Sequence, residues 1–198
     1  ANGIPVAIDL DKNGLINLRE ELKSIYQQDF PIFACSITEI DQLNELKIFL
    51  KNKNIILSGI INNAAINPTM KEDEKYSQFR LENYDLKQWD LELNVGLKGS
   101  YLVVRTFAND LLLHKHIGVI INISSSSAKE NNFGRSIYSS TKNAVESITK
   151  SLSKELSRFN IRVNCIAPGL VETKMLKDNT SEKSIELTLK RISSKRIG

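Results

Sequence analysis

The chain has 198 residues, of which 41% are hydrophobic and 25% are charged, enough for one domain with a sizeable core. The net charge is +4, and Lys and Arg are spread along the chain without a dense run, which argues against a nucleic-acid partner. No apolar stretch reaches the length of a membrane span and no signal peptide is recognisable, so we predict a cytoplasmic protein with no membrane partner.

Strands and helices are expected to alternate along the chain. Short apolar runs predict strands at residues 4–10, 31–35, 55–61, 119–123 and 161–166. Apolar residues at helical spacing predict helices from Leu15 to Ile25, from Ile40 to Leu50, from Asp85 through Leu111, from Ser136 to Phe159, and more weakly after Lys177. The polar stretch from Asn67 to Tyr84 has no clean period and is interpreted as a loop.

This alternation predicts the fold class. Strands that are apolar throughout and separated by helices indicate a doubly wound parallel sheet, with helices on both faces in a three-layer α/β/α arrangement. We find no repeat or linker, so residues 1–198 are assigned to a single domain. Cys35 and Cys165 each lie in an apolar run and are predicted to be free thiols of a reducing compartment.

Two residues that could act together in acid–base chemistry stand at the start of the helix from Ser136. Tyr138 and Lys142 are four residues apart and share one helix face, with Ser136 as the predicted N-cap. A Lys ammonium beside a Tyr phenol favours the phenolate, so the Tyr can act as a general acid or base. The spacing alone is weak evidence, because both residue types are common on helix surfaces.

Other motifs stand in a fixed order around this pair. Ile123-Ser-Ser125 closes an apolar run thirteen residues before Tyr138, Asn62-Asn-Ala-Ala65 closes an earlier run, and Pro168-Gly169 closes a later one. Together with Leu93-Asn-Val-Gly96, these motifs resemble the short-chain dehydrogenase/reductase family. The resemblance runs from about Asp9 to Gly198 and implies a Rossmann-type fold and an NAD(P)-dependent oxidoreductase acting on CH–OH groups, which interconverts a secondary alcohol and a ketone.

The resemblance implies four catalytic residues. Tyr138 would transfer the proton, and Lys142 would assist its ionisation and bind the nicotinamide ribose. Ser125 would orient the substrate oxygen; composition leaves Ser124 to Ser127 open, and the spacing to Tyr138 selects Ser125 within the family pattern. Asn94 would hold a water linked to Lys142.

The resemblance also implies cofactor contacts. Asp9 ends a predicted strand, where its carboxylate would bind the ribose hydroxyls of the adenosine and repel a 2′-phosphate, which favours NAD over NADP. Ile37 would flank the adenine. The stretch from Asn62 to Ala65 would lie along the cofactor ribose, and in it Ala65 stands where the family has Gly. The remaining implied contacts are Asn63, Ala64, Pro168, Gly169, Val171 and Thr173.

Two further expectations concern the whole chain. In the family a strand and a Gly-rich turn precede the position of Asp9 and a strand and helix follow that of Gly198, so we expect the sequence to be incomplete at both ends. We expect a homodimer or homotetramer, a small-molecule alcohol or ketone as substrate, and no metal, because no Cys/His cluster is present. The alternative is a non-catalytic member or remnant of the same fold that serves in binding or oligomerisation.

Overall fold

The protein alternates strands and helices in the predicted order. The structure is a computed structural model that describes residues 3–66, 84–112, 118–130, 135–173, 176 and 182–198. The strands are β1 (Ala7–Asp9), β2 (Ile32–Ala34), β3 (Gly59–Asn62), β4 (Gly118–Ile123) and β5 (Ile161–Ile166). The helices are α1 (Lys12–Tyr26), α2 (Ile40–Asn52), α3 (Leu86–Leu93), the π-helical turn η3 (Asn94–Gly99), α4 (Ser100–Leu112), α5 (Ser127–Glu130), α6 (Ser136–Ser157) and α8 (Glu182–Arg191).

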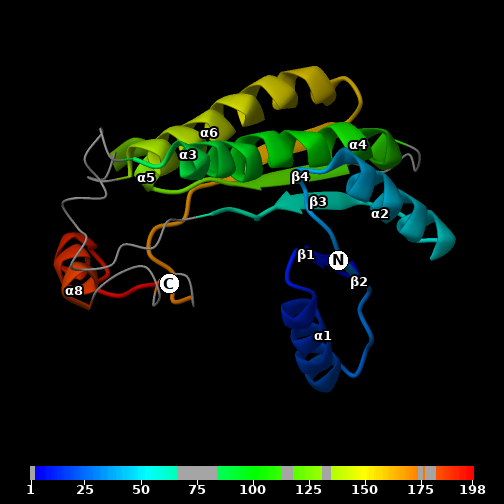
Figure 1. The fold of residues 1–198 in the computed structure, drawn as a ribbon, viewed down its shortest axis with the longest axis horizontal. Coiled ribbons are helices and arrows are strands. Elements are labelled where there is room, and N and C mark those ends of the chain that lie inside the picture. Colours follow the sequence, from blue (N-terminus) through cyan, green and yellow to red (C-terminus); the bar gives the residue numbers. More distant parts are fainter. Residues whose placement is uncertain (1–2, 67–83, 113–117, 131–134, 174–175, 177–181) are drawn as a thin grey trace.

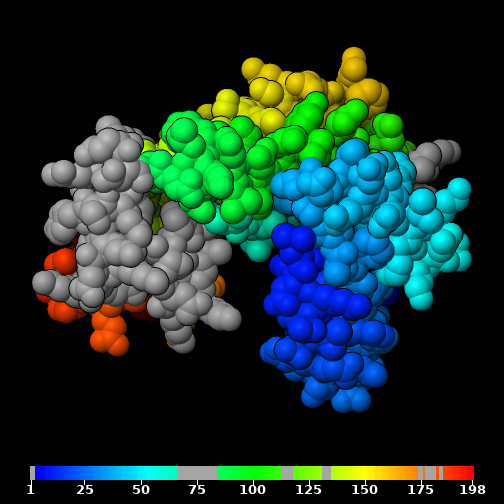
Figure 2. Space-filling model, in the orientation of Figure 1, coloured from blue at the N-terminus to red at the C-terminus, as the bar shows by residue number. Residues whose placement is uncertain are grey.

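The five strands form two parallel sheets. β1 pairs with β2, and β3, β4 and β5 form a second sheet in that order, in which Ile120 stands opposite both Ile60 and Val163. Figure 1 shows β1, β2 and α1 on one side of the larger sheet, and Figure 2 shows the same segment as a protruding lobe. The predicted fold class, a single α/β domain of parallel strands flanked by helices, is therefore confirmed.

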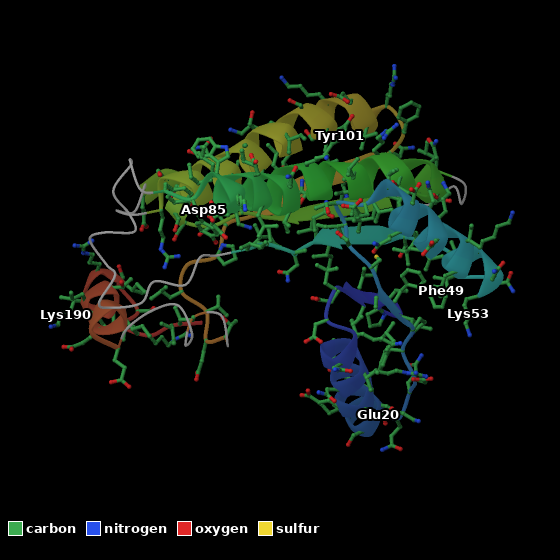
Figure 3. The ribbon with its side chains drawn as sticks, viewed as in Figure 1. Glu20, Phe49, Lys53, Asp85, Tyr101 and Lys190 are labelled. Atoms are coloured by element: carbon green, nitrogen blue, oxygen red, sulfur yellow. The ribbon has the colours of Figure 1, made fainter. Side chains whose placement is uncertain are left out.

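The core lies between the larger sheet and one layer of helices. α4 contacts β3 and β4, and α6 contacts β4 and β5, while α2 packs beside α4. The apolar cluster between them is centred on buried residues of α2, α4 and the strands, namely Leu43, Leu46, Phe107, Leu111, Ile120 and Ile161. Phe49 of α2, labelled in Figure 3, reaches Phe33 of β2 with a ring-centroid distance of 5.1 Å and so joins the smaller sheet to this layer.

Burial alternates along the strands instead of being uniform. In β3, Ile60 is 9% exposed whereas Ile61 is 68% exposed. The uninterrupted apolar runs predicted strands that are covered on both faces. Among the described residues, helices cover only one face of the β3–β5 sheet, and the side chains on that face are the buried ones.

Several element boundaries differ from the sequence expectations. β1 and β3 are shorter than the runs at 4–10 and 55–61. Before β3, the Ile55 amide donates to the Leu50 carbonyl at 2.9 Å, so the start of the second run belongs to the turn that ends α2. The N-cap of α6 is Arg135, and the predicted N-cap Ser136 is the first helical residue. The long helix contains the unpredicted turn η3, whereas the loop from Asn67 lies outside the described residues except for its end.

No described helix is long and apolar enough to cross a membrane.

Candidate functional site

The predicted pair Tyr138 and Lys142 is brought together in the first two turns of α6. The helix has 22 residues, and its inner stripe, which includes Ile137, Val145 and Leu152, is buried against β4 and β5. Lys142 is only 4% exposed, and its Nζ lies 5.8 Å from the centroid of the Tyr138 ring. The two side chains therefore lie on one face of α6 and are close to each other.

Lys142 is held at the carboxyl end of β4. Its Nζ donates a hydrogen bond to the Ile123 carbonyl at 2.8 Å. Burial lowers the pKa of the Lys142 ammonium, because a charge is costly to remove from water, and the neighbouring Cys165 of β5 acts in the opposite direction. The amine therefore releases its proton more readily than the amine of an exposed lysine.

The structure separates the four serines that follow β4. Ser124 is buried, and its Oγ lies 3.0 Å from the Lys142 carbonyl and 3.1 Å from Glu146 Oε1, both acceptors on α6. Ser127 is buried in α5, and its amide donates to Ser125 Oγ at 3.2 Å. Within the described part of the chain no acceptor takes the Ser125 hydroxyl proton, so this half-buried hydroxyl can donate to a ligand.

The loops that leave β4 and β5 are joined to each other. The Ser124 amide donates to the Ile166 carbonyl at 2.7 Å, and the Ser126 amide donates to the Pro168 carbonyl at 2.9 Å. Ser125 therefore stands beside the predicted nicotinamide segment, whose members are half-buried or exposed: Pro168, Gly169, Val171 and Thr173.

Asn94 lies in the irregular part of the long helix. It is half-buried at the first position of η3. Two residues later, Gly96 faces α6 so closely that a methyl group there would lie 2.6 Å from Thr141 Cγ2. The water-holding role of Asn94 stays a prediction.

Two of the predicted cofactor contacts, Asp9 and Ile37, lie at the end of the smaller sheet, and two others follow β3 of the larger sheet. Asp9 ends β1 with an exposed carboxylate, and its Oδ1 accepts the Asp11 amide at 2.9 Å. Ile37 is half-buried beside η3, where a methyl group on Gly99 would lie 2.7 Å from its Cδ1. Asn63 and Ala64 follow β3, and both are exposed.

These positions fit a dinucleotide at both of its ends. Parallel strands end at one edge of a sheet, and ligands of doubly wound folds bind outside that edge. Asp9 uses Oδ1 to accept the Asp11 amide, so its other carboxylate oxygen can accept from a ribose hydroxyl. At the corresponding edge of the larger sheet, Ser125, Tyr138 and Lys142 follow β4. No described residue is assigned to the pyrophosphate. Among the described residues no group of three potential metal ligands occurs.

A buried polar network was missed by the sequence analysis. Asn62 Nδ2 lies 2.8 Å from Asn122 Oδ1 and 3.3 Å from the Ser100 carbonyl, and Asn122 Nδ2 donates to Thr149 Oγ1 at 2.8 Å. The network links β3, β4, α4 and α6. An Asn within the apolar run of β4 was the available signal, because a polar residue in a buried strand requires a partner.

A second unpredicted group surrounds Glu92 of α3, which is 2% exposed. Tyr84 donates its hydroxyl to Glu92 Oε1 at 2.6 Å. Burial and the adjacent carboxylate raise the pKa of Tyr84, so this phenol stays protonated and keeps donating. Glu92 stands one turn before Gly96 on the face toward α6, and a charged residue in that helix stripe was the signal to notice.

Comparison with known proteins gives concordant matches. The family model for short chain dehydrogenases matches residues 1–184. A 3-oxoacyl-[acyl-carrier-protein] reductase of Thermotoga maritima is 31% identical over 193 residues, which are 98% of this chain and 74% of that protein. A sorbitol-6-phosphate 2-dehydrogenase of Klebsiella pneumoniae is 36% identical over 67% of this chain and 49% of its own length.

The fold also matches a solved structure. The crystal structure of a protein assigned as a gluconate dehydrogenase from Agrobacterium tumefaciens aligns with a TM-score of 0.84 and 19% identity. The alignment covers 98% of this chain and 72% of that protein. At this identity the match establishes the Rossmann-like fold alone.

Proposed function

Because the chain belongs to the short-chain dehydrogenase family, we propose that it is an NAD-dependent oxidoreductase that interconverts a secondary alcohol and a ketone. The observation that carries the proposal is the buried Lys142 ammonium, which lies next to the Tyr138 ring and bonds the carbonyl of Ile123, two residues before the Ser125 hydroxyl that can donate. Relatives named as an oxoacyl reductase and a polyol-phosphate dehydrogenase support the reaction class.

Each residue has a separate part in the proposed reaction. The bound NAD supplies the hydride chemistry. In the direction of alcohol oxidation, Tyr138 accepts the hydroxyl proton at its phenolic oxygen, and in ketone reduction it returns that proton. Lys142, fixed by its bond to the Ile123 carbonyl, favours the ionised phenol electrostatically and presents an amine to the nicotinamide ribose. Ser125 donates to the substrate oxygen and fixes its orientation.

Asp9 sets the cofactor preference in this proposal. An exposed carboxylate at the end of β1 binds ribose hydroxyls and repels a 2′-phosphate. With the intact protein we expect NAD(H) to support turnover far better than NADP(H), and Asp9→Ala should narrow the difference. The measurement is kcat/KM with each cofactor, and Asp11→Ala serves as a control for a neighbouring carboxylate. Equal use of both cofactors by the unchanged protein would contradict the assignment.

The proposal extends to assembly as a homodimer or homotetramer. Exposed aromatic residues on or beside the helices of the site layer, Tyr101 of α4 at 44% and Phe159 after α6 at 42%, provide apolar surface for a second copy.

A further inference from the structure

Ser124 lies between the end of β4 and α6, and it has no part in the proposed reaction. The residue is 3% exposed, and its Oγ lies 3.0 Å from the Lys142 carbonyl oxygen and 3.1 Å from Glu146 Oε1. Both of these oxygens accept hydrogen bonds, so the Ser124 hydroxyl donates to α6. Its effect on the site is therefore exerted through the residue that it holds.

Lys142 is bonded at both of its ends by two consecutive residues. Its Nζ donates to the Ile123 carbonyl at 2.8 Å, and its main-chain carbonyl lies against the Ser124 hydroxyl. Ile123 is the last residue of β4 and Ser124 follows it, so one strand end binds both the side chain and the main chain of Lys142. These two contacts restrict a side chain that is long and otherwise flexible.

The strand end that holds Lys142 is itself fixed from the other side. The Ser124 amide donates to the Ile166 carbonyl at 2.7 Å, which joins the exit of β4 to the exit of β5. Ser124 therefore follows β4, bonds β5 through its amide and bonds α6 through its hydroxyl. The amide bond does not depend on the side chain, so a substitution of Ser124 can remove the contact with α6 alone.

We propose that Ser124 is a positioning residue that acts through Lys142: its hydroxyl holds the Lys142 main chain at the end of β4, so that Nζ stays beside the Tyr138 ring. The inference rests on the proposed function, in which the Lys142 amine binds the nicotinamide ribose. A lysine that is already held in place loses less freedom when the cofactor binds, so the loss of this bond should weaken cofactor binding.

The test is a double-mutant cycle in which calorimetry measures the Kd for NAD of the intact protein. Ser124→Ala should raise this Kd by roughly 3- to 10-fold, the effect of one hydrogen bond. In the Lys142→Ala background the same change should raise it by less than about 2-fold, because the side chain that Ser124 positions is gone. A purely structural role would give the same factor in both backgrounds, and that result would overturn the inference.

Glu146 provides a test of which acceptor matters. The Ser124 hydroxyl has one proton and two acceptors, and Glu146 is the half-buried one on the next turn of α6. Glu146→Ala leaves the hydroxyl free to donate to the Lys142 carbonyl, so the Kd should stay within about 2-fold of the wild-type value. A rise as large as that of Ser124→Ala would show that Ser124 acts through Glu146, which contradicts the proposal.

Asn143 is the matched control for a bond that attaches α6 to the segment after β4. It follows Lys142, is exposed, and donates from Nδ2 to the Ala128 carbonyl of α5 at 3.0 Å. Asn143→Ala removes this attachment without removing either bond of Lys142, so the Kd for NAD should stay near the wild-type value. A rise equal to that of Ser124→Ala would mean that any loosening of α6 weakens binding, and the specific role of Ser124 would be refuted.

Ser124→Ala should fold, because the change removes the donor itself and leaves no donor without an acceptor. A thermal melt of each variant checks this. If Ser124→Ala does not fold, Ser124→Cys keeps a similar shape with a weaker donor and should raise the Kd in the same direction by a smaller factor. An unchanged Kd in the folded variant would overturn the inference. Failure of the proposed function looks different, since Lys142→Ala by itself would then bind NAD as tightly as the unchanged protein.

Discussion

Lys142 is a buried lysine, and its burial cannot be inferred from the sequence alone. Its spacing from Tyr138 follows directly from helix geometry, so the sequence was sufficient to pair the two residues. That the ammonium is 4% exposed and bonded to the Ile123 carbonyl depends on how α6 packs on β4. Burial lowers the pKa of this lysine, which distinguishes it from the many Lys residues on helix surfaces.

The structure helps to choose Ser125 among the four serines from Ser124 to Ser127, because it shows the burial and the hydrogen bonds of each. We expect Ser125→Ala to lower kcat by roughly 10²-fold or more, because it removes a donor to the reacting oxygen. Ser126→Ala is the matched control and should leave kcat near the wild-type value, since Ser126 contacts the β5 loop through its backbone amide. Steady-state kinetics on both variants is the measurement, and an equal loss in both would contradict the choice of Ser125.

At the scale of elements, α6 is attached to the sheet by the Asn62–Asn122–Thr149 network. Thr149 Oγ1 donates to the Val145 carbonyl at 2.6 Å and accepts from Asn122 Nδ2. Thr149→Val keeps the shape but leaves that amide buried without an acceptor, so we expect a loss of about 1–3 kcal/mol in the free energy of unfolding. Urea denaturation of the intact protein measures it.

The control for this change lies on the same helix. Ser151 is exposed, and Ser151→Ala should change the free energy of unfolding by less than about 0.5 kcal/mol. Indistinguishable stability of Thr149→Val and Ser151→Ala would mean that the network does not hold α6 to the sheet.

The helices and strands could be predicted where apolar residues recur at a regular helical spacing or form one short apolar run. The stripes of α1, α2 and α6 and the run of β4 predicted those elements closely. The turn η3 was not predicted, and two of its residues, Gly96 and Gly99, lie against Thr141 and Ile37, which are distant in sequence. Contacts between such distant residues cannot be inferred from the order of residues along the chain.

At the scale of the whole molecule, the separation of the two sheets is the main feature. β1 and β3 do not pair with each other, and Ile8 and Ile61 on these strands are 39% and 68% exposed. In the described part of the chain no strand pairs with β1 on its side away from β2 or with β3 on its side away from β4, so these two strand edges are unpaired there.

The central claim is that Tyr138 transfers the proton in an NAD-dependent reaction, and the most direct measurement is kcat of the Tyr138→Phe variant. The change removes the hydroxyl and keeps the ring beside Lys142, so kcat should fall by at least roughly 10²-fold while the melting temperature stays near the wild-type value. Tyr101→Phe, at an exposed tyrosine of α4 (Figure 3), is the matched control and should keep normal activity. Near-normal kcat in Tyr138→Phe would contradict the account, and absence of turnover in the unchanged protein would favour a non-catalytic member of the family.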